Sequence, residues 1–443
     1  MKERLAALSQ ALKLPDVRKR IFFVMIMFTV YIACAHVPMP GVDREALEAM
    51  FQGGTLGEFL NMFVGGSLKR FSVLALGIMP YINASIIFQL LVMAIPQLEE
   101  LQKEGEYGQK KINRWTRYLT MALAALQGMG MIGWFSGAGA FTGGKMDMLF
   151  AVLMMTSGTA FLMWLGDMIT DKGIGQGVSL IIFVGIMAVM PEELMQTIVL
   201  WQGGEIGVAN LLFLIAIFIA TIYGIVKVQQ AQREIPVQYA KRIKGNKIWG
   251  GQVQHLPLRV NQAGVIPIIF AISVALFPAT LANLLRGEAV VNFLSNSFGL
   301  DEGTIDGAIF SIVEFTTPGA NSFASFLYFI LVVVFTYFYT AVTFNPEQIA
   351  ENLQKNGGAI RGIRPGEKTR DYLDKILYRI TLAGALFLGV VALMQYYIGP
   401  ITGVPTFTLV GGTSLLIVVG VALDTMQQIE AHLLMRHYTG FLS

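Results

Sequence analysis

Residues 77–86 read GIMPYINASI and place a glycine, a proline, an asparagine and a serine near the middle of a long apolar run. The run covers residues 71–95, which is long enough to cross a lipid bilayer as a helix. Proline removes one backbone hydrogen bond and pushes against the preceding turn, so we expect this helix to bend. Lipid cannot satisfy the freed carbonyl, and the stretch therefore predicts a helix that lines protein or an aqueous path.

The same spacing returns in GVIPIIFAIS, residues 264–273. The equivalent pairs are Gly77 with Gly264, Pro80 with Pro267, Ile82 with Ile269 and Ala84 with Ala271. The motifs lie in the second and seventh apolar spans, so the two helices run in opposite directions, as in an inverted repeat whose paired interruptions mark the functional interface. An ordinary kinked helix remains the alternative for either motif taken alone.

The composition of the whole chain is that of an integral membrane protein. Its 443 residues are 54% hydrophobic and 14% charged, and the mean hydropathy is +0.60. Ten uncharged runs approach the length of a membrane span, the shortest being 178–190: residues 21–37, 71–95, 118–135, 148–166, 178–190, 208–226, 260–285, 322–344, 380–398 and 407–423. We therefore expect an all-α integral membrane protein with ten transmembrane helices in two inverted-repeat halves of five, residues 21–190 and 208–423.

The distribution of basic residues predicts the orientation. Alternate connections hold 27 of the 32 lysines and arginines, namely residues 1–20, 96–117, 167–177, 227–259, 345–379 and 424–443. The positive-inside rule then makes the N-terminal segment 1–20 and the tail 424–443 cytoplasmic. No small-residue cleavage site follows the first apolar run, so we expect it to be retained as a span. The single cysteine, Cys34, gives no disulfide framework.

The stretch GGTLGEFLNMFVGG, residues 53–66, places ten residues between two glycine pairs. As a helix they would reach about 15 Å, half a bilayer, so they cannot cross it. Leu56, Phe59, Leu60 and Phe63 share one apolar face. Two interpretations remain open: a surface amphipathic helix, or a re-entrant helix on glycine hinges that enters from the outer side.

The ten runs contain no Asp, Glu, Lys or Arg. Ion-coupled carriers usually need such a group inside the membrane. There is also no HExxH spacing, no Walker A loop and no histidine in a span beside the GGTS of residues 411–414, so we expect no metal, no cofactor and no catalysis. The pattern favours a wide passive passage closed by an apolar constriction. A secondary transporter for a small uncharged solute is the alternative, and an intramembrane enzyme is a distant third.

Two connections, residues 227–259 and 345–379, carry seven basic residues each and exceed a minimal link. Interleaved aromatic residues suit docking to ribosomal RNA or an acidic protein surface. Positive-inside topology with anionic lipid would explain their charge, although not their length. We therefore favour partner docking, and expect no DNA partner.

Several motifs together resemble the SecY family, the channel subunits of the bacterial Sec protein translocase. They are GIMPYINAS, QYAKR followed by HLPLRVNQAGVIP, FNPEQIAENLQKNGG followed by GIRPGEKT, and TLVGGTSLLIVV, in order from about residue 15 to 430. The resemblance implies a protein-conducting channel of the general secretory pathway in the bacterial cytoplasmic membrane. It also implies partners: SecE and SecG subunits, the SecA ATPase, the ribosome, signal peptides, nascent chains and membrane lipid.

The resemblance also implies roles for individual residues. The apolar pore ring would consist of Ile78, Ile82, Ile182, Ile269 and Ile417. The plug, about residues 55–67, would include Leu56, Phe59, Leu60, Asn61 and Phe63. The polar lateral gate would contain Asn83, Ser85, Gln89 and Asn261, and partner docking would use Lys241, Arg242, Arg361 and Arg364. One departure is Glu234 after Arg233, where many relatives have two adjacent basic residues. It leaves open whether this chain makes one of the docking contacts that the resemblance implies.

Overall fold

The computed structural model describes residues 14–43, 66–137, 139–239, 242–244, 247–249, 253–284, 302–404 and 412–439. The chain forms two compact units. The first comprises residues 1–206, 273–325 and 417–443, and the second comprises residues 207–272 and 326–416.

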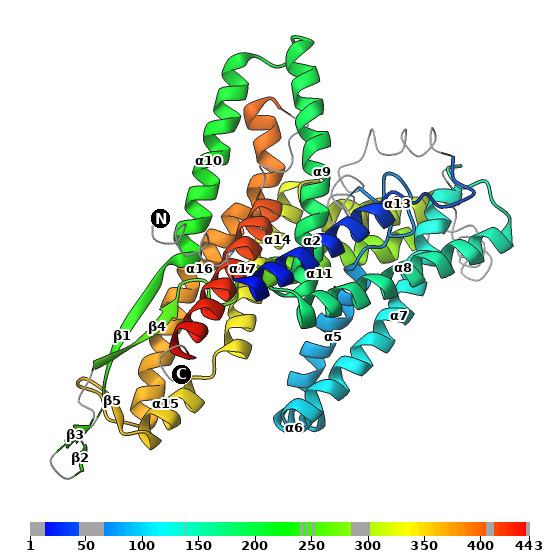
Figure 1. Cartoon of the computed structure of the whole chain (residues 1–443). Helices are drawn as coiled ribbons and strands as arrows, with labels where there is room; N and C mark the ends of the chain where they lie inside the picture. Colours follow the sequence, from blue (N-terminus) through cyan, green and yellow to red (C-terminus); the bar gives the residue numbers. More distant parts are fainter. Residues whose placement is uncertain are drawn as a thin grey trace. The chain divides into compact units, whose positions relative to one another are not determined.

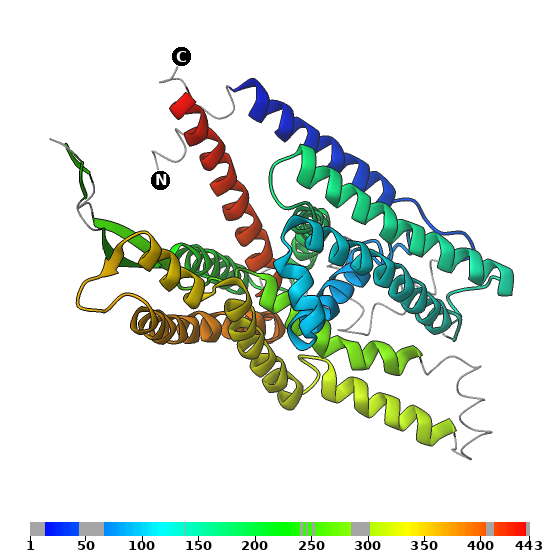
Figure 2. The same cartoon turned by 90° about the horizontal axis from the view of Figure 1, so that it is seen from below.

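The first unit is helical. It contains α2 (Pro15–Ala35), α5 (Met79–Ala94), α6 (Pro96–Lys103), α7 (Glu106–Gly137), α8 (Lys145–Lys172), α9 (Gly177–Gln202), α13 (Glu302–Thr316) and most of α17 (Thr413–Thr439). Within it α7 lies beside α5 and α8, and α8 also packs against α2 and α9 (Figures 1 and 2). Three helices are shared between the units: α11 (Ile266–Leu284), α14 (Ser322–Thr343) and α17, whose first four residues belong to the second unit.

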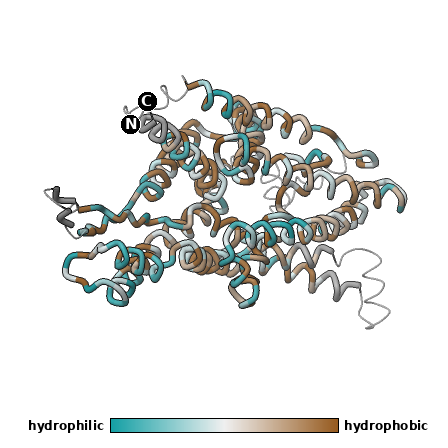
Figure 3. Tube along the Cα trace, turned by 60° about the horizontal axis from the view of Figure 1, so that its bottom comes forward, coloured by the Kyte–Doolittle hydropathy of each residue, from teal (hydrophilic) through white to brown (hydrophobic). Residues whose placement is uncertain are grey.

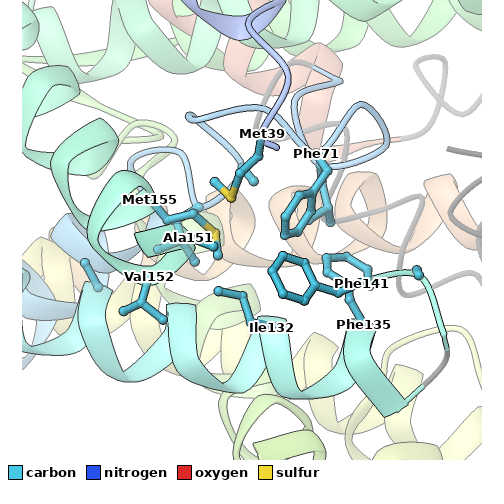
Figure 4. Packing of buried hydrophobic residues seen from close by; sticks show 13 residues of the cluster. Met39, Phe71, Ile132, Phe135, Phe141, Ala151, Val152 and Met155 are labelled. Carbon is cyan, nitrogen blue, oxygen red and sulfur yellow. The ribbon is translucent and has the colours of Figure 1, made fainter. Parts of the chain in front are cut away.

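A buried cluster of the first unit joins α7 and α8 to the segment before α5 (Figure 4). The ring of Phe71 meets the ring of Phe135 edge-on, with centroids 4.8 Å apart and planes at 82°. Met39 and Met155 lie beside these rings. Edge-to-face pairs add to the stability that apolar burial provides, so this cluster fixes the segment that leads into α5.

Residues 66–78 form a succession of turns, not a helix, and most of them are buried. Their backbone groups find partners inside the protein: Met39 N–H donates to the Phe71 carbonyl over 2.9 Å, and Ser72 N–H donates to the Ser67 carbonyl over 2.8 Å. Irregular backbone at membrane depth is tolerated only under such conditions. The apolar composition of residues 71–78 therefore reflects burial in protein and not a helical span.

The second unit combines membrane helices with a small sheet. Its elements are α10 (Val208–Gln230), β1 (Gln232–Tyr239), β2 (Arg242–Lys244), β3 (Lys247–Trp249), β4 (Val253–Arg259), α15 (Pro346–Lys355), β5 (Gly358–Ile360) and α16 (Glu367–Thr402), with parts of the shared helices. The strand order is β4-β1-β5, with antiparallel pairs, and β2 pairs with β3 separately. The sheet continues from the end of α10 and lies beside α15 (Figure 1).

A hydrophobic cluster lies beneath this sheet. Ile235 and Val237 of β1, Leu258 of β4 and Ile360 of β5 pack on Leu373 of α16. The described parts of the two basic connections, 227–259 and 345–379, therefore fold into one module. We name it the cytoplasmic module after the side that the positive-inside rule predicts for it.

Each of the ten apolar runs overlaps a helix, and the mostly helical membrane architecture with ten helices is confirmed. Among the described residues, seven helices are long and apolar enough to cross a membrane, or eight if α5 and α6 form one bent span. Hydrophobic residues run along the long helices, and hydrophilic residues gather in several of the turns that join them (Figure 3).

Two boundaries differ from the sequence prediction. The short run 178–190 belongs to a helix of 26 residues, because α9 continues through Pro191. Span two begins as a helix only at Met79, because residues 66–78 are buried turns.

Candidate functional site

The glycine and proline of GIMPYINASI form the start of a helix and not a bend within one. Gly77 has a φ of +56°, and Pro80 lies in the first turn of α5, where its missing N–H removes no helical hydrogen bond. Thr159 of α8 donates its hydroxyl to the Gly77 carbonyl over 3.2 Å. The expected bend at Pro80 is therefore wrong. The sharp bend, 101°, lies between α5 and α6.

The echoing motif has the same design. Gly264 has a φ of +66°, and Pro267 lies in the first turn of α11, so the expected bend is wrong here too. The Asn261 side chain donates its Nδ2–H to the Gly264 carbonyl over 2.9 Å. Both motifs thus combine a left-handed glycine, a proline that opens the helix, and a side chain that satisfies the glycine carbonyl.

Four helices share a further pattern. Each contains an isoleucine five residues after a glycine at its start: Gly77 with Ile82 in α5, Gly177 with Ile182 in α9, Gly264 with Ile269 in α11, and Gly412 with Ile417 in α17. These isoleucines lie within the first two turns of their helices. They are buried, with exposed fractions of 6%, 3%, 8% and 1% respectively.

Ile78, the fifth residue predicted for the ring, is the N-cap residue of α5 and is 3% exposed. Ile269 belongs to the second unit, and the other four isoleucines belong to the first.

The polar residues predicted for a gate are divided between α5 and the turn before α11. On α5, Asn83, Ser85 and Gln89 are half-buried, and Gln89 Nε2 donates to Ser85 Oγ over 3.2 Å. Asn261 is 5% exposed, and its Oδ1 has no hydrogen-bond partner among the described residues. Asn261 therefore has a local structural role at the start of α11.

The residues predicted for the plug, Leu56, Phe59, Leu60, Asn61 and Phe63, lie outside the described residues. The chain is described again from Gly66, where Lys69 Nζ lies 3.2 Å and Arg70 Nη2 lies 3.4 Å from the Glu192 carboxylate of α9. These contacts attach the segment after the predicted plug to α9.

Arg70 also approaches the end of α2. Its Nη1 lies 2.7 Å from His36 Nε2, and His36 Nδ1 lies 2.8 Å from the Ile32 carbonyl. Because a guanidinium only donates, Nε2 accepts and Nδ1 carries the proton. The sequence alone did not reveal the contacts of His36 and Glu192 with Arg70, because they join residues far apart in the chain.

The cytoplasmic module presents the arginines predicted for docking. Arg361 and Arg364 are exposed in the turn between β5 and α16. That turn has two left-handed glycines, Gly362 with φ +83° and Gly366 with φ +97°, and Thr369 Oγ1 donates to the Arg364 carbonyl over 2.9 Å. The hydrogen bond from Thr369 therefore fixes the backbone of this turn, while the side chains of Arg361 and Arg364 face solvent.

The other docking residues lie near the far end of β1. Arg242 begins β2, and Lys241 lies outside the described residues. Arg233 and Glu234 are exposed on β1, with Gln232 Nε2 donating to Glu234 Oε1 over 3.3 Å. In the parts of the chain that the structure describes, no three His, Cys, Asp or Glu side chains gather closely enough to hold a metal ion.

The model of the SecY family matches residues 72–426, most of the chain. The chain belongs to the SecY family. The matched residues extend from the buried turns before α5 into α17, so they include all four helices that start at a glycine.

Two relatives match this chain over almost its whole length. The protein translocase subunit SecY of Halalkalibacterium halodurans is 44% identical, covering 98% of this chain and 99% of the relative. That of Aquifex aeolicus is 43% identical and covers 100% of both chains.

Three solved structures share the fold. One is described as "The structure of a protein conducting channel" and has a TM-score of 0.63 at 20% identity, covering 95% of this chain and 93% of that one. A second concerns the plug domain of a SecY protein, with a TM-score of 0.62, 20% identity and the same coverage. The third, canine Sec61 in a ribosome-channel complex, has a TM-score of 0.62, 19% identity and the same coverage. As a member of the SecY family with several apolar spans, this chain is a multi-pass membrane protein.

Proposed function

We propose that this SecY-family chain is the protein-conducting channel of the general secretory pathway. It passes unfolded polypeptides across a bacterial cytoplasmic membrane and releases hydrophobic segments sideways into lipid. The observation that carries the proposal is the set of four helix starts, each with a glycine and a buried isoleucine five residues later, in a chain of this family.

The five isoleucines form the pore ring in this proposal. By the alternating topology, α5 and α17 run from the outer side inward, whereas α9 and α11 run outward. Because these helices run in opposite directions, the isoleucines near their starts can lie at the same depth only if the helices start within the membrane and not at its two surfaces. The buried turns 66–78 before α5 support such a start. A ring of apolar side chains excludes water and ions when closed and can part around a moving chain.

The lateral gate in this proposal combines α5 with the region of Asn261. A signal helix that leaves through it exchanges protein contacts for lipid contacts of similar polarity, so opening can be nearly balanced in free energy. The plug, about residues 55–67, closes the outer side. Its flank is attached to α9 through Lys69, Arg70 and Glu192.

The chain has no power source of its own in this proposal. SecA or a ribosome docks on the cytoplasmic module through Arg361, Arg364, Lys241 and Arg242. SecE and SecG complete the channel, and both termini are cytoplasmic. The exposed turn of Arg364 supports this role, because its backbone is held and its charges are free to meet an acidic surface or RNA.

The test is reconstitution of the complex into proteoliposomes with a secretory precursor. Precursor import that requires SecA and ATP, without uptake of small uncharged solutes, is expected. Arg364→Glu should abolish SecA-driven import and leave membrane insertion of the channel intact, whereas the charge-matched control Lys110→Glu on α7 should retain import. Solute uptake in the absence of any ATPase would favour a secondary transporter instead.

A further inference from the structure

The second unit contains an open pocket of about 670 Å³ where the end of α14 faces the beginning of α16. Apolar side chains make up much of its wall, including Ala341, Phe344 and Leu377. Lys375 and Arg379 of α16 also line it. The pocket thus has an apolar interior beside two cations.

The pocket lies at one end of two membrane spans. The apolar run of α14 ends at residue 344 and that of α16 begins at residue 380, so the lining residues stand where both helices leave the hydrocarbon. This end carries the two basic connections, so the positive-inside rule predicts that it is the cytoplasmic end.

Two tyrosines reinforce this position. The rings of Tyr337 and Tyr378 have centroids 5.1 Å apart, and Tyr337 donates its hydroxyl to the Tyr378 carbonyl over 3.2 Å. Tyrosine is enriched at the level of lipid headgroups because its ring is apolar and its hydroxyl is polar. The pocket is therefore at headgroup depth.

Neither Lys375 nor Arg379 forms an ion pair with another described residue. Lys375 and Arg379 are exposed and one helical turn apart, and the ion pairs nearby join Lys355 to Glu351 and Arg370 to Asp371 instead. The one acid in the lining is Asp374. Like charges at this spacing destabilise a helix, so an anion between them would stabilise it.

We propose that this pocket binds the phosphate headgroup of an anionic phospholipid from the cytoplasmic leaflet. Lys375 and Arg379 contact the phosphate, and an acyl chain lies along Phe344 and Leu377. Basic pockets between membrane helices on the cytoplasmic side suit such headgroups. Free phosphate would use the cations but not the apolar wall, so the combination favours a lipid. The proposal rests on the orientation of the chain and not on conduction, so its failure would leave the proposed function standing.

The test measures lipid binding to the purified complex in detergent by native mass spectrometry. Phosphatidylglycerol, phosphatidylcholine and inorganic phosphate are titrated separately. The double variant K375Q/R379Q removes the two pocket cations. The control K355Q/K368Q removes two exposed cations of the same unit that do not line the pocket.

Wild-type protein should bind phosphatidylglycerol more tightly than phosphatidylcholine, and K375Q/R379Q should weaken phosphatidylglycerol binding by about 30-fold, since each surface cation contributes roughly fivefold. The control variant should lose less than about threefold. A second variant, Ala341→Trp, fills the pocket without changing charge and should also weaken lipid binding.

Three outcomes would overturn the proposal: equal loss in both double variants, equal affinity for the two lipids, or saturation by inorganic phosphate with no lipid preference. A photo-crosslinker at Ala341 that captures a protein subunit and no lipid would assign the pocket to a polypeptide and overturn it as well.

Discussion

α5 and α11 start with the same glycine and proline spacing, yet different contacts hold the two starts. The Gly77 carbonyl accepts from Thr159 of α8, 82 positions along the chain. The Gly264 carbonyl accepts from Asn261, three positions earlier. The start of α5 therefore depends on tertiary packing, and that of α11 depends on its own turn.

The segments that precede the two helices differ in the same way. Before α5, Ser67, Phe71 and Ser72 are fully buried, and Phe71 packs into the cluster of α7 and α8. Before α11, the chain comes directly from β4, and the Val260 N–H donates to the Ala231 carbonyl over 2.9 Å. The same glycine and proline motif thus starts one helix after a long buried segment and the other helix directly after a β-strand. We expect substitutions near α5 to destabilise the protein more.

Substitution of the glycine that precedes a third helix, α17, should cause the largest loss of stability. Gly412 has a φ of +59°, and an added Cβ would collide with the Val391 carbonyl of α16. Gly412→Ala combines left-handed strain with overpacking, and should lower the free energy of unfolding by about 3 kcal/mol. Chemical unfolding in detergent micelles measures this change. A loss no greater than that of Gly264→Ala would contradict the crowding argument.

Thr159→Val should follow in size. It conserves volume but leaves the buried Gly77 carbonyl without its donor, and should lower the free energy of unfolding by about 2 kcal/mol. The matched control is Thr156→Val, whose hydroxyl donates to the Val152 carbonyl within its own helix. If the two variants lose the same stability under chemical unfolding, α5 does not depend on α8 at this point.

Gly264→Ala tests the effect of backbone strain on stability without the effect of crowding. Nothing lies within 4 Å of the added Cβ, so only the φ of +66° opposes the substitution. The expected loss is about 1 kcal/mol, detected as a shift of the denaturant midpoint. No measurable shift would mean that the turn relaxes, and α11 would then start without a left-handed residue.

The smallest effect is expected for Asn261→Ala. It removes the hydrogen bond to Gly264 but also removes an Oδ1 that has no partner among the described residues. These contributions oppose each other, and the net loss should stay below about 1 kcal/mol. Asn113→Ala, which removes an exposed hydrogen bond to Gln109, is the control in the same unfolding assay. A loss that equals that of Thr159→Val would remove the contrast between the two helix starts.

The sequence was sufficient for much of this fold because long uncharged runs have few alternatives to membrane helices. Composition could not separate a buried irregular segment from a helix, since both are apolar, and residues 71–78 were therefore assigned to a span. The uncharged run 178–190 ends directly before Pro191. The helix continues through it, and only the tertiary structure shows this.

The site was predictable where residues are adjacent and unpredictable where contacts are long-range. The spacing between the glycines and the isoleucines can be found in the sequence. The helix bounds were needed to show that the same spacing occurs at the start of four helices. The pairing of β1 with β5 brings together segments about 120 residues apart, so the cytoplasmic module was expected only as two basic loops. The contacts of Glu192 and His36 with Arg70 were missed for the same reason.

The most direct test of the central claim uses a photo-crosslinking residue at Ile82 and, separately, at Ile269, with a secretory precursor stalled midway through the membrane. Ile219 on α10, which is 61% exposed, is the control site. Crosslinks to the precursor from both Ile82 and Ile269, and none from Ile219, are predicted, because the two echoing helix starts face one polypeptide path. A precursor that crosses the membrane without crosslinking to either isoleucine would contradict the account.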